Sequence, residues 1–196
     1  MKQLCLTGPF GAGKSLAARL IIEACDEAGI ATTRVDLDHV AHEVEDTDAR
    51  VRDRLAKTFG AKILKPDGLI DRKKLATIAF KNAENTQKLN WIVHPATVAR
   101  AQQMVHAASE HGILVILESP LPVRNWFPDA TIWTVHAPVE ERLRRVMGKG
   151  FSRSDARRRF ARQPDPEVYQ AEADLVIENA GGFKDLEDVV RDGLRI

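Results

Sequence analysis

The feature that most constrains this chain is a glycine-rich segment that directly follows its first apolar run. Residues 8–15 read G-P-F-G-A-G-K-S, which fits the pattern G-x-x-x-x-G-K-[ST]. The apolar residues 4–6 precede it, and a helix is predicted from about residue 14 to residue 28. Between a strand and a helix, such a loop points successive backbone N–H groups at phosphate oxygens. The chain is therefore predicted to bind a nucleoside triphosphate.

Each residue of this loop has a predicted part in nucleotide binding. The glycines give the backbone the freedom to curl, and the N-terminus of the following helix adds partial positive charge. Lys14 is expected to contact the β- and γ-phosphates, and the Ser15 hydroxyl is expected to ligate Mg²⁺. The predicted nucleotide-binding residues of the loop are Gly8, Pro9, Phe10, Gly11, Ala12, Gly13, Lys14, Ser15 and Leu16.

Short apolar runs alternate with helical segments along the rest of the chain. Strands are predicted at residues 4–6, 30–35, 113–117, 131–135 and 175–177, and residues 39–111 are mostly helical, with a turn at 65–68. This pattern predicts a three-layer α/β/α fold around a five-stranded parallel sheet. We expect a single domain with a core of about 1–38, 112–140 and 170–196, a helical acceptor-binding insertion at 39–111, and a basic lid at 141–169.

Carboxylates follow two of the predicted strands. Asp36 and Asp38 come after the second strand, and Glu118 ends the third. In a parallel sheet, ligands bind at the carboxyl ends of the strands, so one aspartate could take the proton of an attacking hydroxyl while the other helps to hold Mg²⁺. If the second strand runs through both aspartates, their spacing aims them the same way. The alternatives are a surface turn or helix cap for the aspartates, and an ordinary strand-end carboxylate for Glu118.

The segment from Arg142 to Arg162 is rich in arginine, and Asp155 is its only acidic residue. A solvated helical face is one interpretation of such a run. Beside a nucleotide site, a lid whose arginines face phosphates is the other. A compact chain with a helical insertion and a basic lid is typical of small-acceptor kinases, in which the lid closes to exclude water.

The composition excludes several other classes of protein. The net charge is +1, which gives no strong attraction to nucleic acid or to an anionic membrane. The two cysteines form no C-x-x-C pair, so neither a disulfide framework nor a cysteine metal site is expected. No apolar run is long enough to span a bilayer, and the early first strand leaves no room for a secretory signal. We therefore expect a cytoplasmic protein without nucleic-acid or membrane partners.

Several longer strings carry a family resemblance. They are V-D-L-D-H-V-A-H-E-V at 35–44, D-G-L-I-D-R-K-K-L at 67–75, L-N-W-I-V-H-P at 89–95, and A-D-L-V-I-E-N-A-G at 173–181. Together with the glycine-rich loop, Phe80, Pro120-Leu121 and Gln163, they make the chain similar to the dephospho-CoA kinase family over nearly its whole length. The strings D-G-x-I-D-R and A-D-x-V-I-x-N-x-G are specific in combination.

The resemblance implies a reaction and a set of site residues. ATP would be the donor, with Mg²⁺, and the ribose 3′-hydroxyl of dephospho-CoA the acceptor; we expect a monomer or weak homo-oligomer. The catalytic set would be Asp38 as general base, Lys14, and Arg145 as a lid arginine that stabilises the transferring phosphate. Further implied sites are Asn179 and Gly181 for the adenine end of ATP, Asp36, Arg72, His94 and Gln163 for the acceptor, and Ser15, Asp36 and Glu118 for the metal.

The chain also departs from the family pattern. Leu16 replaces a threonine after the loop, Arg124 replaces the glutamate of P-L-L-x-E, and Arg142 replaces a lid glutamine. Lys149 stands for a second lid arginine, and Tyr169 for a basic residue after Gln163. Two alternatives therefore stay open. One is a divergent kinase of the same nucleotide-binding class that acts on another small hydroxyl acceptor, and the other is a nucleotide-binding protein without turnover.

Overall fold

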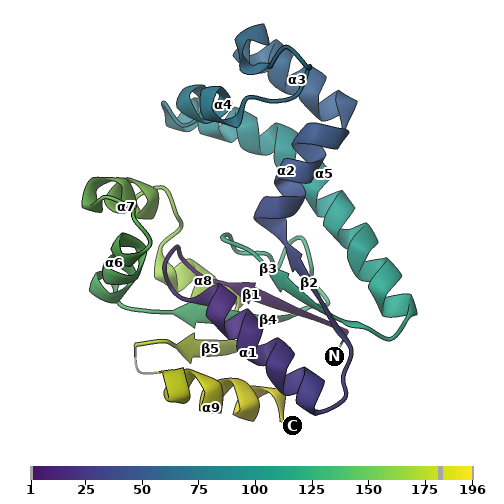
Figure 1. Cartoon of the computed structure of the whole chain (residues 1–196), viewed down its shortest axis with the longest axis vertical. Helices are drawn as coiled ribbons and strands as arrows, with labels where there is room; N and C mark the ends of the chain where they lie inside the picture. Colours follow the sequence, from purple (N-terminus) through teal and green to yellow (C-terminus); the bar gives the residue numbers. More distant parts are fainter. Residues whose placement is uncertain (1, 181–182, 196) are drawn as a thin grey trace. The chain divides into compact units, whose positions relative to one another are not determined.

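A computed structural model of the protein describes residues 2–180 and 183–195. Its centre is a parallel sheet of five strands, as predicted, and the strand order is β2-β3-β1-β4-β5 (Figure 1). The strands are β1 (Gln3–Thr7), β2 (Thr32–Asp36), β3 (Leu114–Glu118), β4 (Thr131–His136) and β5 (Leu175–Glu178). Every residue of β3 is buried, as expected for a parallel strand covered on both faces.

The chain divides into two compact units. Residues 1–36 and 105–196 form the sheet unit, and residues 37–104 form the helical unit. The helical unit begins directly after β2, two residues before the range 39–111 that was predicted as an insertion, and it ends at residue 104. The nucleotide-binding loop, β3, and the basic segment after β4 all belong to the sheet unit.

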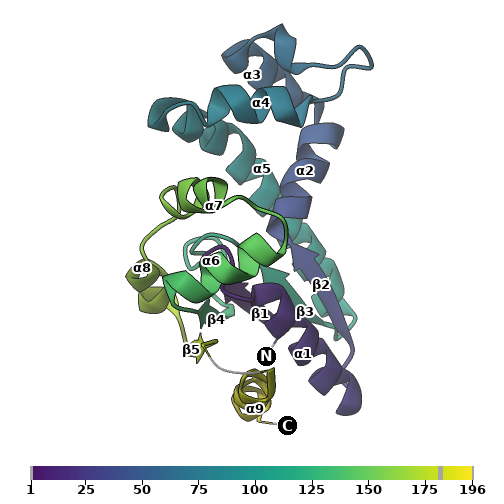
Figure 2. The same cartoon turned by 60° about the vertical axis from the view of Figure 1, so that its left-hand side comes forward.

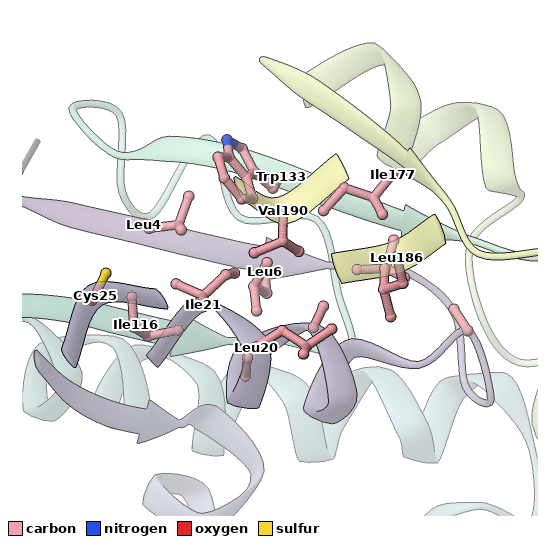
Figure 3. Packing of buried hydrophobic residues seen from close by; sticks show 14 of the residues in the cluster. Leu4, Leu6, Leu20, Ile21, Cys25, Ile116, Trp133, Ile177, Leu186 and Val190 are labelled. Atoms are coloured by element: carbon pink, nitrogen blue, oxygen red, sulfur yellow. The ribbon is translucent and has the colours of Figure 1, made fainter. Parts of the chain in front are cut away.

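Two helices cover one face of the sheet. Alternate residues of β1 and β4, Leu4, Leu6, Trp133 and Val135, pack with residues of α1 (Lys14–Glu27) and α9 (Phe183–Leu194) in one buried cluster (Figure 3). The intervening residues point to the opposite face, because side chains alternate along a strand. There, Thr7 and Thr134 share a hydrogen bond of 2.7 Å between their hydroxyls. This polar contact lies on a face that is also buried, since Cys5 and Ile132 on the same face are fully buried.

Three short helices follow β4, namely α6 (Val139–Gly148), α7 (Arg153–Phe160) and α8 (Pro166–Glu172) (Figure 2). Ser152 caps α7 by accepting a hydrogen bond from the Asp155 N–H at 3.1 Å, and Pro166 occupies the first turn of α8. Leu143 and Val146 of α6 are buried against Ala156 of α7. The basic segment is therefore a pair of packed helices and not an extended tail.

The helical unit contains α2 (Leu37–Thr47), α3 (Ala49–Phe59), a 3₁₀ turn (Ala61–Ile63), α4 (Arg72–Ala79) and most of α5 (Ala83–Glu110). Asp48 caps α3 and Asp71 caps α4 through their side chains. The predicted turn at 65–68 is closed by a hydrogen bond of 3.0 Å from Gly68 N to Lys65 O. Within the ranges 2–180 and 183–195, no helix combines the length and the apolar character needed to cross a membrane.

Candidate nucleotide-binding site

The loop between β1 and α1 requires glycine at its first position. Gly8 has φ of +130°, and a Cβ built there would lie 2.2 Å from the backbone oxygen of Val135 in β4. Gly11 and Gly13 also have positive φ, at 83° and 108°. The loop is closed by a hydrogen bond of 3.1 Å from Ala12 N to Pro9 O. The first turn of α1 then starts from Gly13, so the orphan N–H groups of that helix lie at the loop.

Lys14 folds back over this loop. Its Nζ donates a hydrogen bond of 2.8 Å to Gly8 O and lies 3.4 Å from Pro9 O. The ammonium group therefore sits over the same curve of backbone whose amides would hold phosphates. This arrangement places the only side-chain cation of the motif at the loop, and its contact with phosphates stays a prediction.

Arg145 of α6 and Asn179, which follows β5, meet at one backbone oxygen of the loop. Ala12 O accepts hydrogen bonds from Arg145 Nη1 at 3.0 Å and from Asn179 Nδ2 at 2.7 Å. Arg145 also donates to the backbone oxygen of Asn179 at 2.7 Å. Asn179 is buried, and a Cβ on Gly13 would lie 2.2 Å from its Nδ2. The structure thus brings together two predicted site residues from distant parts of the chain, whereas Gly181 lies outside the described residues.

Gln163 also contacts the loop. Its Oε1 accepts a hydrogen bond of 2.7 Å from the Phe10 N–H, while Arg142 Nε donates to Phe10 O at 2.9 Å. Arg142 is 4% exposed, and burial lowers the pKa of its guanidinium. The family resemblance assigned Gln163 to the acceptor, and Arg142 was noted both as the start of the arginine-rich segment and as a departure from the family pattern. Neither contact with Phe10 was foreseen, because nothing local in the sequence pairs residues that are more than 130 positions apart.

Glu118, at the end of β3, is held from two sides. Ser15 Oγ donates to its Oε2 at 3.1 Å, and Arg34 Nε donates to its Oε1. The glutamate is 4% exposed, and these two donors satisfy both of its carboxylate oxygens. Arg34 is a site residue that the sequence reasoning missed. Its position two residues before Asp36 could have indicated this role, because residues two apart in a strand lie on the same face.

The two aspartates lie on different elements. Asp36 ends β2 and pairs in register with Glu118 on the adjacent strand, whereas Asp38 lies in the first turn of α2, which begins at Leu37. The strand therefore does not continue through both residues, which was the condition for their side chains to point in the same direction. The chain turns into a helix directly after Asp36, so each carboxylate is positioned by its own element.

Arg72 and His94 both belong to the helical unit. Arg72 starts α4 and joins it to α2, donating to His42 O at 3.0 Å and pairing with Asp46 and Glu45. Burial raises the pKa of Glu45, which is only 7% exposed. Burial also lowers the pKa of His94 on α5, which favours the neutral imidazole.

Arg124, one of the departures from the family pattern, is committed to internal contacts. Its guanidinium donates to the backbone oxygen of Glu172 at 2.7 Å and to both carboxylate oxygens of Asp174 at 3.0 and 3.1 Å. Glu172 in turn accepts hydrogen bonds from the backbone N–H groups of Val123 and Arg124. The arginine therefore joins the loop after β3 to the segment that leads into β5.

Tyr169 is likewise internal. It is fully buried, and its hydroxyl donates to Pro120 O at 2.7 Å. Burial raises its pKa to about 12, so the phenol stays protonated. Its backbone oxygen accepts a hydrogen bond of 3.0 Å from Thr134 on β4. Of the other departures, Leu16 packs at the edge of the main core, and Lys149 is exposed at the end of α6.

Comparisons with known proteins agree with one another. Residues 3–185 match the family model described as dephospho-CoA kinase. A dephospho-CoA kinase from Corynebacterium glutamicum is 36% identical over 190 residues, which cover 95% of this chain and 92% of that protein. One from Carboxydothermus hydrogenoformans is 33% identical, with coverage of 94% and 89%.

Solved structures show the same fold. A protein from Thermus thermophilus superposes with a TM-score of 0.75 and 31% identity, over 98% of this chain and 96% of that one. A dephospho-CoA kinase from Campylobacter jejuni gives a TM-score of 0.67 at 22% identity, with coverage of 99% and 96%. Shikimate kinase from Acinetobacter baumannii, at 16% identity and a TM-score of 0.51, covers 98% of this chain and is similar in fold alone.

Proposed function

Because the chain belongs to the dephospho-CoA kinase family, we propose that it transfers the γ-phosphoryl group of ATP to the ribose 3′-hydroxyl of dephospho-CoA. The chain is accordingly an ATP-dependent phosphotransferase. The observation that carries the proposal is the family match over residues 3–185, which includes both the nucleotide-binding loop and the strings at 67–75 and 89–95.

The donor site is built from the sheet unit. The loop amides and Lys14 would hold the β- and γ-phosphates, and Lys14 would stabilise charge that develops as the phosphoryl group leaves. Arg145 would supply a second positive charge from the lid. Its hydrogen bond to Ala12 O, at 3.0 Å, already places its guanidinium against the loop.

Asp38 would act on the acceptor as general base, taking the proton of the ribose hydroxyl. Arg72 and the neutral His94 would bind the acceptor. The contacts of Arg72 with Asp46 and with His42 O hold its guanidinium against α2, the helix that also carries Asp38. A pre-ordered arginine of this kind can bind a phosphate group with little loss of side-chain entropy.

Mg²⁺ suits the oxygen groups that gather at the end of β2 and β3. Ser15 Oγ contacts Glu118, and Asp36 lies opposite Glu118 in register, so a hydroxyl and two carboxylates share one edge of the sheet. Hard cations prefer such oxygen ligands, and Mg²⁺ keeps several waters and phosphate oxygens besides. Mg²⁺ held by these residues would supply charge neutralisation to the phosphates during transfer.

A coupled assay of ADP release tests the proposal. Purified protein with ATP and Mg²⁺ should release ADP when dephospho-CoA is added, and the product should carry phosphate on the 3′-oxygen. Lys14→Ala should abolish turnover, and Asp38→Asn should lower kcat while ATP still binds. ATP binding without any ADP release on addition of dephospho-CoA would sink the proposal.

The alternative of a different small acceptor rested on Arg124, Lys149 and Tyr169. Two of these three residues are engaged in internal contacts, Arg124 with Asp174 and Tyr169 with Pro120. These contacts explain why Arg124 and Tyr169 differ from the family pattern without any role in acceptor binding. Dephospho-CoA is the acceptor that the remaining observations support best.

A further inference from the structure

We propose that Phe10, Arg142 and Gln163, here called the Phe10 clamp, are positioning residues that couple the basic helix α7 to ATP binding. The inference rests on the proposed use of the loop at residues 8–15 as the ATP site. It assigns to Gln163 a part in donor binding, where the family resemblance implied the acceptor. It also gives Arg142, which departs from the family pattern, a part in the same site.

The clamp holds both polar backbone atoms of Phe10. The Phe10 N–H donates to Gln163 Oε1 at 2.7 Å, and Phe10 O accepts from Arg142 Nε at 2.9 Å. Arg142 Nη2 lies 3.4 Å from the same Gln163 oxygen, which closes the set. Phe10 is the third residue of the loop. Its two partners, Arg142 and Gln163, come before and after α7 in the chain, so a shift of the Phe10 backbone would break hydrogen bonds to both.

The ring of Phe10 packs against α7 and the residue that leads into it. Its centroid lies 5.3 Å from that of Phe151 and 6.4 Å from that of Phe160, both in edge-on arrangements. Arg159 of α7 places its guanidinium over the rings of Phe10 and Phe151, at 5.2 and 4.8 Å. Edge-on aromatic pairs and cation–π contacts each add to the stability gained from burial. The loop and α7 therefore share one small aromatic cluster.

Arg142 is buried, and its guanidinium is held in place by several contacts. Its guanidinium is taken out of water, which is costly unless its donors are satisfied. It stacks 4.2 Å above the Phe160 ring and donates to the loop backbone. The backbone of the neighbouring Gly11 packs closely against α6, since a Cβ there would lie 2.9 Å from both Arg142 O and Val146 Cγ1. A shift of α6 or α7 must therefore move the loop at Phe10 and Gly11.

Coupling of this kind acts in both directions. If the position of α7 sets the geometry of the loop, the lid residues contribute to ATP affinity even where they do not touch ATP. By linkage, ATP binding must then stabilise α7 by the same free energy. The clamp predicts both effects, and it predicts that they are lost together.

The test compares three variants with a matched control. Phe10→Ala, Arg142→Met and Gln163→Ala each remove one member of the clamp. Arg19→Met is the control, because Arg19 pairs with Glu23 on an exposed part of α1. Two quantities are measured without dephospho-CoA: the Kd for ATP by calorimetry, and hydrogen exchange of the amides at 151–160 with and without ATP. The KM for dephospho-CoA is measured separately in the coupled assay.

Arg142→Met and Gln163→Ala should each raise the Kd for ATP about tenfold, the effect of losing one charge-assisted or backbone hydrogen bond. Phe10→Ala keeps both backbone hydrogen bonds but loses the aromatic contacts of the ring, which should raise the Kd for ATP by a similar factor. ATP should slow exchange at 151–160 in the wild type and in Arg19→Met, and have little effect on it in the clamp variants. The KM for dephospho-CoA should change less than the Kd for ATP. A general loss of structure would instead alter both constants and lower the thermal midpoint.

Wild-type Kd for ATP in Gln163→Ala, or full ATP protection of α7 in Arg142→Met, would overturn the inference. Gln163 is only partly buried, so its variant should fold even where Phe10→Ala does not. If Gln163→Ala raised the KM for dephospho-CoA more than the Kd for ATP, Gln163 would serve acceptor binding and the inference would be wrong. Since the ATP measurements need no acceptor, they stand even if dephospho-CoA is not the substrate, and the two proposals fail separately.

Discussion

Ser15 Oγ donates a hydrogen bond of 3.1 Å to Oε2 of Glu118, so the first turn of α1 is tied to the end of β3, the strand between β2 and β1. The second carboxylate oxygen of Glu118 is taken by Arg34 from β2. Three elements of the sheet unit therefore converge on one buried carboxylate. Because Ser15 and Glu118 are both proposed to serve Mg²⁺, the stability of this contact and the use of the metal should be linked.

The first prediction concerns Arg34→Met. Of the two side chains that donate to Glu118, Ser15 and Arg34, this variant removes Arg34 and leaves Ser15. We expect the free energy of unfolding, measured in urea, to fall by about 2 kcal/mol, since an uncompensated buried charge costs that much or more. The Mg²⁺ concentration for half-maximal turnover should also change, while Arg19→Met should leave both quantities unaltered. Equal stability of Arg34→Met and wild type would show that Arg34 does not support the carboxylate.

A second prediction separates the two donors to Ala12 O. Arg145→Ala should lower kcat by about 100-fold or more, as for other arginines that stabilise the transferring phosphoryl group. Asn179→Ala removes a hydrogen bond of 2.7 Å to the same oxygen but no charge, so it should raise the KM for ATP with a much smaller loss of kcat. Matching losses of kcat in the two variants would mean that Arg145 only supports the loop.

A third prediction concerns Tyr169 and Arg124. Tyr169→Phe removes the hydrogen bond to Pro120 O and leaves that carbonyl without this donor, which should cost about 1 kcal/mol of stability. Arg124→Met loses its contacts with Asp174 and should also destabilise the fold. Neither variant should change the KM for dephospho-CoA. A rise in that KM of tenfold or more in either variant would place its side chain at the acceptor and revive the hypothesis of an altered pocket.

The sequence predicted those features that depend on short stretches of chain. The loop at residues 8–15, the buried strand β3 and the parallel direction of the strands follow from local pattern and from the rule that helices connect parallel strands. The start of β2 was misplaced. Ile30 was predicted as strand, but its N–H donates to Cys25 O at 2.8 Å beside Gly29 at φ of +71°, which is the motif that ends α1.

The contacts that organise the site could not be predicted in this way. Arg142 and Phe10 are 132 positions apart, and Arg124 meets Asp174 across 50 positions. Such pairs depend on how the sheet brings β1, β4 and β5 together, and a sequence pattern carries no record of that geometry. The same limit explains the interpretation of Arg124 and Tyr169 as acceptor-site changes, since only the fold reveals that their partners are internal.

The last prediction uses two glycines that both have a positive φ but differ in their surroundings. Gly8 and Gly29 both have positive φ, at 130° and 71°, where an L side chain is strained. A Cβ on Gly8 would lie 2.2 Å from the backbone oxygen of Val135, whereas a Cβ on Gly29 would meet nothing within 4 Å. Gly29→Ala should therefore cost about 1 kcal/mol from φ alone.

Gly8→Ala should cost at least about 3 kcal/mol, because the clash is with backbone of a central strand and cannot be relieved by a side-chain rotation. It should also weaken ATP binding, since the loop would have to move away from β4 at its first residue. Urea unfolding of the two variants and of the wild type, with the Kd for ATP of each folded protein, makes the comparison. A Gly8→Ala protein as stable as Gly29→Ala, with ATP affinity unchanged, would contradict the close approach of the loop to Val135.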